Sequence, residues 1–178
     1  MSVLLNQSNF PDFDNFLSKT KKYSYPANTL IFKEGDISET LYFILIGSIS
    51  VVLHDDNNRE IIIAYLNPGD FFGELGLFDE SNKRSAFVRA KEKCEIAQIS
   101  YERLKKLNVV LPDLLLDIAS QLAIRLRKTS RKVSDLALTD VKGRVARALL
   151  DLCKEPDAMT HPEGMMVRIT RQELGRIV

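Results

Sequence analysis

Residues 71–86 read FFGELGLFDESNKRSA, and the glycines and charges of this stretch describe a site for an anion. Gly73 and Gly76 flank a carboxylate, Glu74, directly after an apolar pair that is expected to end a strand. Glycine lets backbone N–H groups approach an anion closely, and a short helical turn beginning here would direct its positive end toward that anion. Glycines at this spacing are also common in ordinary turns, so they do not establish a ligand alone.

Two residues near the end of this stretch, Arg84 and Ser85, add donors that suit a phosphate group. An arginine guanidinium offers a planar pair of N–H donors to phosphate oxygens, and the serine adds a hydroxyl and an amide. Glu74 would repel a phosphate but accept a hydrogen bond from a sugar hydroxyl. The whole stretch therefore predicts a compact ligand with one phosphate and a ribose. A surface ion pair of Arg84 and a solvent-facing Glu74 are the ordinary alternatives.

The surrounding chain, from about Tyr23 to Ser100, has the pattern of an antiparallel β-domain. Turn residues recur at intervals of roughly 8–12 residues, which is typical of a sandwich or barrel. Residues 49, 51 and 53 are apolar and alternate with 50 and 52, so one side of that strand is expected to be more deeply buried. The run 61–66 is apolar on both faces and predicts a strand that is covered twice.

The character of the chain changes after Tyr101, and a long helix is expected from Leu111 to Ala137. That range contains no glycine, and its one proline, Pro112, stands in the first turn, where proline is tolerated. Its apolar seam follows alternating steps of four and three through Leu115, Ala119, Leu122, Leu126, Thr129, Val133 and Leu136. The pattern predicts a coiled coil between two copies of the chain, with Ile118 and Ala123 leaning on the β-domain. A helix packed on its own core would show a similar stripe.

Thr129 interrupts the seam with a hydroxyl, which costs stability in a coiled coil and needs a hydrogen-bond partner. A bond back to a carbonyl of the preceding turn is one explanation. Ser130 follows it, and basic residues cluster nearby at Arg125, Arg127, Lys128, Arg131 and Lys132. A solvated helix face is the ordinary explanation of such a cluster. Polar groups at the midpoint of an apolar interface also suit a ligand held between two subunits.

A further segment is expected to begin after a hinge at Leu138 to Asp140. Thr139 or Asp140 can cap a helix that runs to about Leu152, and Pro156 stops that helix.

A short strand is then expected at 165–169, and Thr170 and Glu173 form a capping box for a last helix. A domain does not normally stop two turns into a newly capped helix, so this domain is expected to be truncated at Val178. The fold class is therefore predicted to be α+β. The predicted divisions are a β-domain at 1–110, a dimerisation helix at 111–137 and a truncated domain at 138–178.

Composition excludes several classes of protein. Charged residues make up 28% and hydrophobic residues 45% of the chain, which is ordinary for a globular protein. The longest apolar runs, 41–46 and 61–66, are too short to cross a bilayer, and no secretory signal is visible. Cys94 and Cys153 have no metal or redox spacing, which favours reduced thiols and a cytoplasmic location.

Catalysis and metal binding are not expected from this sequence. His54 and His161, the only histidines, lie in different predicted domains, so the ligand cluster of a cupin-type metalloenzyme cannot be assembled. No nucleophile with an adjacent base is visible either. The predicted protein is a binding protein and not an enzyme.

Motifs in both halves of the chain resemble those of one known family. GELGLF at 73–78, followed by RSA at 84–86, is similar to the phosphate-binding cassette of cyclic-nucleotide-binding domains. Longer matching stretches are LNPGDFFGELGLF, RSAFVRAK, PDAMTHPEGM and ITRQELGRIV. Together they resemble the family of the cyclic AMP receptor protein, or catabolite gene activator, among the bacterial CRP/FNR-type transcription regulators. The first twenty-odd residues and the turn at 55–59 match this family less well.

The resemblance implies a jelly-roll-like β-roll that binds cyclic AMP, a coiled-coil helix and a winged helix-turn-helix domain whose recognition helix is absent. The corresponding ligand residues are Gly73, Glu74, Leu75, Arg84, Ser85, Thr129 and Ser130. The resemblance places Glu74 on the ribose 2′-hydroxyl, and Arg84 and Ser85 on the cyclic phosphate. Thr129 of one subunit and Ser130 of its partner would contact the adenine.

The resemblance also implies contacts outside this pocket. Some members bind a second nucleotide near the DNA-binding domain, and the corresponding positions are Asn58, Arg59, Glu60, Ile61, Ile62, Ile63, Ala64, Ala137 and Gln172. Thr170 and Arg171 would meet a DNA phosphate, a contact that positions a protein without reading the sequence. The loop 158–166 resembles a surface that touches RNA polymerase. The implied partners are a second copy of the chain, double-stranded DNA and RNA polymerase, with no membrane.

Alternatives from other classes share parts of this pattern. A regulatory module of a kinase or channel would share the cassette but not the helix-turn-helix start after a dimerisation helix. A related regulator that senses haem, oxygen or another effector usually lacks the Arg84–Ser85 pair. The cassette does not distinguish cyclic GMP from cyclic AMP, whereas Thr129 and Ser130 favour adenine by resemblance. Replacing Arg84 by leucine is expected to abolish nucleotide binding and to leave a folded dimer.

Overall fold

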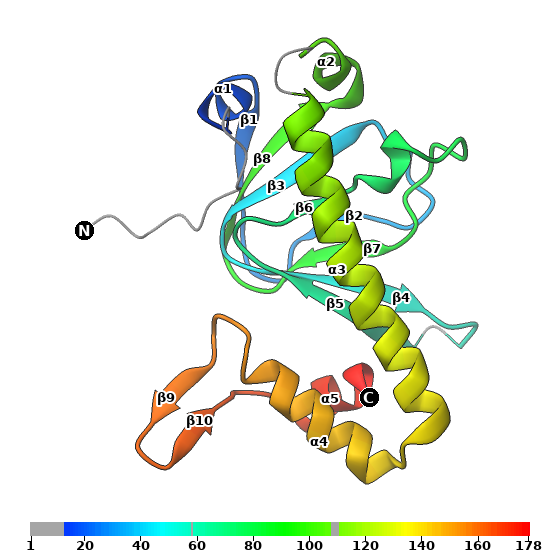
Figure 1. Ribbon diagram of the computed structural model, residues 1–178, viewed down its shortest axis with the longest axis vertical. Coiled ribbons are helices and arrows are strands. Elements are labelled where there is room, and N and C mark those ends of the chain that lie inside the picture. Colours follow the sequence, from blue (N-terminus) through cyan, green and yellow to red (C-terminus); the bar gives the residue numbers. More distant parts are fainter. Residues whose placement is uncertain (1–12, 58, 108–110) are drawn as a thin grey trace.

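The computed structural model describes residues 13–57, 59–107 and 111–178 and confirms the α+β class. A β-domain is followed by one long helix, which leads to a C-terminal segment of two helices and a hairpin (Figure 1). The order of elements agrees with the sequence-based expectation. The division of the chain at residues 110 and 137 stays a prediction.

Two four-stranded antiparallel sheets form the β-domain, as the turn spacing predicts. The first sheet has the order β1-β8-β3-β6, with β1 (Lys21–Tyr25), β8 (Cys94–Ser100), β3 (Thr40–Ile46) and β6 (Phe71–Phe72). The second has the order β2-β7-β4-β5, with β2 (Leu30–Phe32), β7 (Phe87–Ala90), β4 (Ile49–His54) and β5 (Glu60–Leu66). One apolar cluster, which includes Ile44, Ile96, Ile49 and Val88, lies between the two sheets.

A second apolar cluster covers the other face of the first sheet. It joins Phe43 and Phe71 of that sheet to Phe16 of α1 (Phe13–Ser18) and to Leu114 and Ile118 of the long helix. Strands β3 and β8 are covered on both faces, because Phe43 and Ala97 enter this cluster whereas Ile44 and Ile96 enter the other. A short helix, α2 (Tyr101–Lys105), follows the last strand.

Two expectations about the second sheet are wrong. The run 61–66 is not covered twice, because Ile61 and Ile63 remain exposed. In β4, residues 49, 51 and 53 were expected to be the more deeply buried ones, but Val52 is buried and Val51 only half-buried. The reason is a shift of the pairing register between Val51 and Val52, which changes the face on which the following side chains lie.

The long helix α3 (Leu111–Leu138) runs along the β-domain and continues beyond it (Figure 1). Its buried side chains include Leu114 and Ile118, so the predicted contact of Ile118 with the β-domain is confirmed. Ala123 is exposed, and the prediction that it leans on the β-domain is wrong. The helix ends at the predicted hinge, where Asp140 caps the next helix.

The exposed apolar stripe of α3 differs in phase from part of the predicted seam. Leu115 and Leu122 are half-buried, and Leu122 packs against the core of its own β-domain. The stripe left exposed has the same spacing and consists of Leu116, Ala119, Ala123, Leu126, Val133 and Leu136, with Thr129 and Ser130 between its apolar members.

The C-terminal segment consists of α4 (Val141–Leu152), the hairpin β9 (Met159–His161) and β10 (Gly164–Met166), and α5 (Arg171–Ile177). The predicted strand at 165–169 corresponds to β10, which ends at Met166. Only one of the two hydrogen bonds of the predicted capping box forms. Thr170 accepts a hydrogen bond from the Glu173 amide at 3.1 Å, but the Glu173 carboxylate accepts from Tyr65 instead.

Polar contacts join this segment to the β-domain. Tyr65 donates to Glu173 at 2.7 Å, Asn67 donates to Glu155 at 2.8 Å, and Lys91 pairs with Asp157 at 2.6 Å. Burial, and secondarily the carboxylate of Glu173, raise the pKa of Tyr65 above its ordinary value. The tyrosine hydroxyl therefore stays a donor to Glu173 throughout the physiological pH range.

Glu60 is a further carboxylate at this junction, and it makes the stability of the chain depend on pH. It accepts from Arg89 at 2.8 Å and pairs with Arg176 of α5 at 2.8 Å. The hydrogen bond from Arg89 outweighs the effect of burial and holds the pKa of Glu60 below its ordinary value. The stabilisation is therefore present above the unfolded pKa, about 4.3, and is lost as the pH falls through the lower pKa of the folded state.

Replacing Glu60 by glutamine is expected to lower the free energy of unfolding by about 1 kcal/mol at pH 7. Urea denaturation at pH 7 and at pH 3.5 measures the effect, and the gap between variant and parent should narrow at the lower pH. Glu102→Gln is the control, because Glu102 pairs with Lys106 on the exposed face of α2. An equal loss at both pH values would contradict the assignment.

Within the described ranges, no helix is long and apolar enough to cross a bilayer. Those same residues contain no group of three or more His, Cys, Asp or Glu side chains arranged to hold a metal ion.

Candidate functional site

The cassette is a turn that leaves β6 at Phe72 and enters a short 3-10 helix, η1 (Leu75–Leu77). Gly73 has a positive φ of 72°, and a Cβ there would lie 2.5 Å from Nη1 of Arg84. A Cβ on Gly76 would lie 2.1 Å from the Ser38 hydroxyl. Both positions therefore require glycine because other protein groups lie so close to them. This reason is separate from the predicted approach of an anion.

Arg84 lies in the interior of the domain, with only 6% of its surface exposed, so the surface ion pair is excluded. Its Nη2 donates to the Thr40 carbonyl at 2.8 Å, and its Nη1 donates to the Gly73 carbonyl at 3.1 Å and to the Tyr101 hydroxyl at 3.2 Å. These bonds use three of the five N–H donors, and the Tyr42 hydroxyl is a further hydrogen-bond partner of the guanidinium. The remaining donor capacity of this buried guanidinium suits a phosphate group.

Two aromatic rings contact the guanidinium of Arg84 and restrict its orientation. Its central carbon lies 4.4 Å from the ring centroid of Phe32 and 5.2 Å from that of Tyr42. Tyr42 stacks in turn on Phe72, at 4.7 Å between centroids. Burial raises the pKa of Tyr42 above its ordinary value, so its ring stays neutral beside the arginine. Cation–π contacts of this kind fix the orientation of the fork as well as its position.

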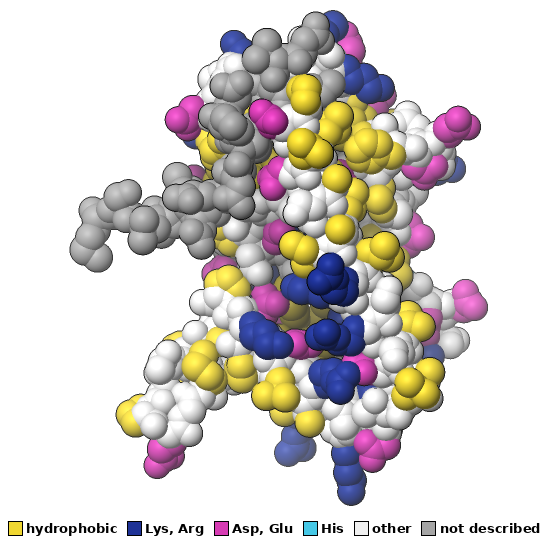
Figure 2. All heavy atoms as spheres, viewed as in Figure 1, with side chains coloured by type: hydrophobic (Ala, Val, Ile, Leu, Met, Phe, Trp, Pro, Cys, Tyr) yellow, Lys and Arg dark blue, Asp and Glu magenta, His cyan; other side chains and the backbone are white. Residues whose placement is uncertain are grey.

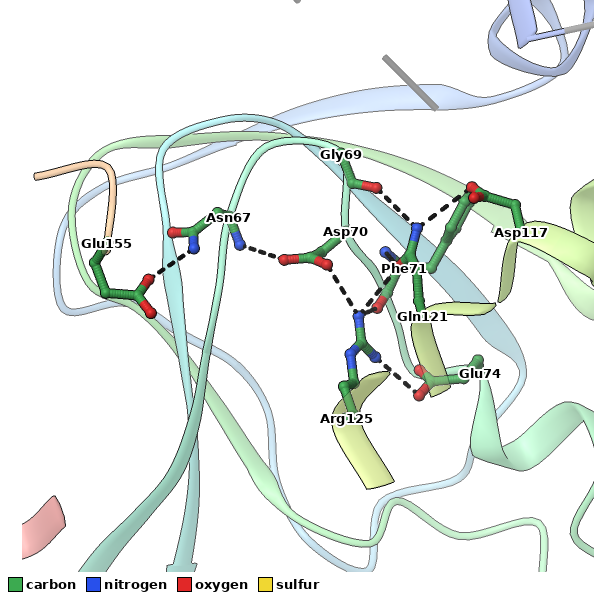
Figure 3. Close-up of polar contacts among 9 residues, drawn as sticks. All are labelled: Asn67, Gly69, Asp70, Phe71, Glu74, Asp117, Gln121, Arg125 and Glu155. Atoms are coloured by element: carbon green, nitrogen blue, oxygen red, sulfur yellow. Dashed lines mark hydrogen bonds and ion pairs between the residues drawn. The ribbon is translucent and has the colours of Figure 1, made fainter. Parts of the chain in front are cut away.

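Glu74 is also buried, at 6% exposure, and faces the long helix instead of solvent. Its Oε1 accepts from Nη1 of Arg125 on α3 at 3.1 Å (Figure 3). Arg125 further donates to the Phe71 carbonyl and, at 3.2 Å, to Gln121, and it approaches Asp70 at 3.5 Å. The turn that carries Glu74 is therefore tied to α3 by a charged network.

The other candidate residues are exposed. Ser85 follows Arg84 directly, and Leu75 is 47% exposed in η1. Thr129 and Ser130 lie on α3, one turn beyond Arg125, and neither hydroxyl makes a hydrogen bond to any described residue. The back-bond of Thr129 to the preceding turn does not form. The structure thus brings Gly73, Glu74 and Arg84 together, and leaves Thr129 and Ser130 with donors and acceptors directed outward.

The basic cluster of the long helix has two parts. Arg125 is half-buried in the network around Glu74, whereas Arg127, Lys128, Arg131 and Lys132 are exposed. Figure 2 shows Lys and Arg side chains gathered where α3 passes from the β-domain to the C-terminal segment. The solvated-face explanation therefore holds for Arg127, Lys128 and Arg131. It is wrong for Arg125 and for the ammonium of Lys132, which donates to the Ile63 carbonyl at 3.0 Å and whose pKa burial lowers.

Three residues of the site were not predicted from sequence to be part of it. Arg125 carried a signal, since it is basic and stands four residues before Thr129, but nothing singled it out within its cluster. Tyr101 and Gln121 carried none. Tyr101 reaches the cassette because β8 pairs with β3, and Gln121 reaches it through the packing of α3 on the first sheet.

The positions of the expected second nucleotide site lie mainly on β5 and near α5. Asn58 lies outside the described residues. Arg59, Ile61, Ile63, Ala137 and Gln172 are exposed, whereas Glu60, Ile62 and Ala64 are wholly or partly buried. The ion pair of Glu60 with Arg176 brings β5 close to α5. A ligand site there stays a prediction, as do the DNA contacts of Thr170 and Arg171.

Comparison with known proteins assigns the β-domain to a class. Residues 22–108 match the cyclic nucleotide-binding domain family, and this range contains Gly73, Glu74 and Arg84. A buried arginine bonded to the glycine turn that carries a buried carboxylate is consistent with that class.

Relatives define the family of the whole chain. The chain is 51% identical over 181 residues to the cAMP-activated global transcriptional regulator Vfr of Pseudomonas aeruginosa, covering 100% of this chain and 85% of that protein. It is 51% identical over 168 residues to the cAMP-activated global transcriptional regulator CRP of Salmonella typhimurium, covering 94% and 80%. The chain therefore belongs to the CRP/FNR family of transcription regulators.

A solved structure shows the same architecture. The regulator CLP of Xanthomonas campestris superposes with a TM-score of 0.88 at 43% identity, over 93% of this chain and 82% of that one. CLP is described as responsive to c-di-GMP. The family thus includes proteins that respond to different nucleotides, and ligand identity has to be argued from the site.

Proposed function

We propose that this chain is a cAMP-dependent, DNA-binding transcription regulator. The observation that carries the proposal is the pair formed by Arg84 and Glu74. The buried guanidinium of Arg84 is bonded to the glycine turn that carries the buried carboxylate of Glu74, which suits a cyclic phosphate joined to a ribose. The names of Vfr and CRP, each about half identical to this chain, support cAMP as the effector.

The long helix connects this site to the rest of the molecule. Arg125 of α3 pairs with Glu74, so a ligand that contacts Glu74 acts on a helix that also carries Thr129 and Ser130. In a homodimer formed through the exposed stripe of α3, adenine would lie between Thr129 of one subunit and Ser130 of the partner subunit. Nucleotide that binds more tightly to the DNA-competent arrangement shifts the population toward it through the hinge at 138–140.

The C-terminal segment supplies the expected partner surfaces. Thr170 and Arg171 at the start of α5 are proposed to meet a DNA phosphate. The loop 158–166, where Met159, Met165 and Met166 are exposed, is proposed to touch RNA polymerase. The proposed location is the cytoplasm, where these partners occur. We propose no catalytic role.

Calorimetric titration with cAMP, cGMP and c-di-GMP tests the proposed effector. We expect cAMP to bind more tightly than the other two. Saturable binding of c-di-GMP with no binding of cAMP would overturn the proposal.

Replacing Thr129 by valine keeps the shape of the side chain and removes its hydroxyl. If the hydroxyl contacts adenine, cAMP binding should weaken by about 5- to 10-fold, with a smaller effect on cGMP. The same titration measures the change. Thr160→Val is the control, because Thr160 lies in the exposed hairpin. Equal weakening for both nucleotides would argue against contact with the base.

A further inference from the structure

Gln121 makes four hydrogen bonds at the crossing of α3 and β6 (Figure 3). Its Oε1 accepts from the Phe71 amide at 2.9 Å and from Nη2 of Arg125 at 3.2 Å. Its Nε2 donates to the Gly69 carbonyl at 3.0 Å and to Asp117 at 3.3 Å. All the donors and acceptors of one neutral side chain are therefore used between the helix and the strand that leads into the cassette.

This arrangement fixes the direction of Arg125. Its Nη2 donates to the Phe71 carbonyl, to Gln121 and, at 3.5 Å, to Asp70, so Nη1 is left directed at Glu74. A guanidinium is planar, and holding one of its terminal nitrogens sets the direction of the other. Without the Gln121 oxygen, Nη2 would keep the Phe71 carbonyl and the long bond to Asp70 at 3.5 Å, and the guanidinium would be free to move closer to Asp70 and away from Glu74.

The direction of Arg125 matters because Glu74 is a buried carboxylate. A buried carboxylate needs a partner charge and hydrogen bonds to stay ionised and in place. Arg125 is the charged partner recorded for Glu74 among the described residues. If Arg125 turns away, the carboxylate loses this partner and is free to change its rotamer, so its oxygen is no longer presented in one fixed direction.

We propose that Gln121 is a positioning residue which, through Arg125 and Glu74, sets how strongly the site distinguishes a ribose from a 2′-deoxyribose. The inference rests on the proposed function, in which Glu74 accepts from the ribose 2′-hydroxyl. A site built to hydrogen-bond a hydroxyl discriminates strongly against an analogue that lacks it, provided that the acceptor is held in place.

Calorimetric titration of the full chain with cAMP and with 2′-deoxy-cAMP tests this inference. In Gln121→Leu we expect cAMP binding to weaken by about 5- to 10-fold and 2′-deoxy-cAMP binding to change by less than about 2-fold, so the ratio of the two dissociation constants collapses. An unchanged dissociation constant for 2′-deoxy-cAMP would show that the contacts with the phosphate and the base are intact in the variant. Gln121→Ala, which leaves room for water, carries the same expectation if the leucine variant does not fold.

Gln121→Glu is the matched variant, because it keeps an oxygen for Arg125 and the Phe71 amide but loses the donor to Gly69 and Asp117. We expect it to retain the parental ratio within about 2-fold even if it is less stable. Equal weakening of both ligands in Gln121→Leu, or no change in either, would overturn the inference alone. Failure of the unsubstituted chain to bind cAMP would overturn the proposed function and the inference together.

Discussion

Replacing Arg84 by leucine is expected to weaken cAMP binding by about 100-fold or more and to lower the free energy of unfolding by about 2–4 kcal/mol. The first effect follows from losing the charge-assisted hydrogen bonds to the phosphate. The second follows from the donors that Arg84 gives to Thr40, Gly73 and Tyr101, whose oxygens would be left with fewer partners. Calorimetry and urea denaturation measure the two effects separately.

The second effect adds a loss of stability to the sequence-based expectation, in which this variant loses nucleotide binding and remains a folded dimer. A residue predicted to serve only the ligand also holds the glycine turn against β3 and α2. Arg84→Lys separates the two roles, because it keeps the charge but not the planar fork, and should bind cAMP with intermediate affinity. Lys83→Leu, at the exposed neighbouring position, is the control. Unchanged affinity in Arg84→Leu would show that the pocket has been assigned to the wrong residues.

Replacing Leu126 by glutamate is expected to raise the dissociation constant of the dimer by about 100-fold or more. Leu126 is 69% exposed in the single chain and belongs both to the predicted seam and to the stripe that the fold leaves uncovered. The substitution loses the burial of a leucine in each subunit and brings two like charges to a symmetric interface. Sedimentation analysis across a range of protein concentrations measures the change.

Lys128→Glu is the matched control for this experiment, because it reverses a charge on the same helix about 200° around from Leu126. Lys128 is exposed and lies off the apolar stripe. It should leave the dimer within about 3-fold of the parent. A dimer that survives Leu126→Glu, or that Lys128→Glu disrupts equally, would mean that the subunits meet elsewhere.

The predicted site residues that the structure brings together are those whose chemistry has few other uses. An arginine next to a serine, and a glutamate between glycines, point to an anion and a hydroxyl whatever the packing around them. Gln121 and Tyr101 have no such distinctive chemistry. Gln121 hydrogen-bonds a strand 50 positions earlier in the chain, a contact that depends on how α3 crosses the first sheet.

Periodicity predicted the kind of element more reliably than the face it buries. The helix and its heptad spacing were predicted correctly, but the stripe is wide enough to allow two phases. Packing of Leu122 on the β-domain selects the phase in which Leu116 and Ala123 stay exposed. The prediction that the strand at 61–66 is covered on both faces was wrong for a related reason. An apolar side chain can stay exposed on the outer face of a sheet without preventing folding.

The bonds between the β-domain and the segment beyond the hinge have a consequence for how the protein responds to its surroundings. Among the described residues, neither apolar core cluster extends past Leu122, and the recorded links across this junction are hydrogen bonds and ion pairs such as Lys91–Asp157 and Glu60–Arg176. Ion pairs at a protein surface contribute about 0–1 kcal/mol each, and dissolved salt screens them over about 10 Å at 0.1 M, though less strongly where a pair is partly buried, as these two are. Ionic strength should therefore act as a second effector, loosening the docked segment and reducing the binding energy that a nucleotide must supply to reorient it.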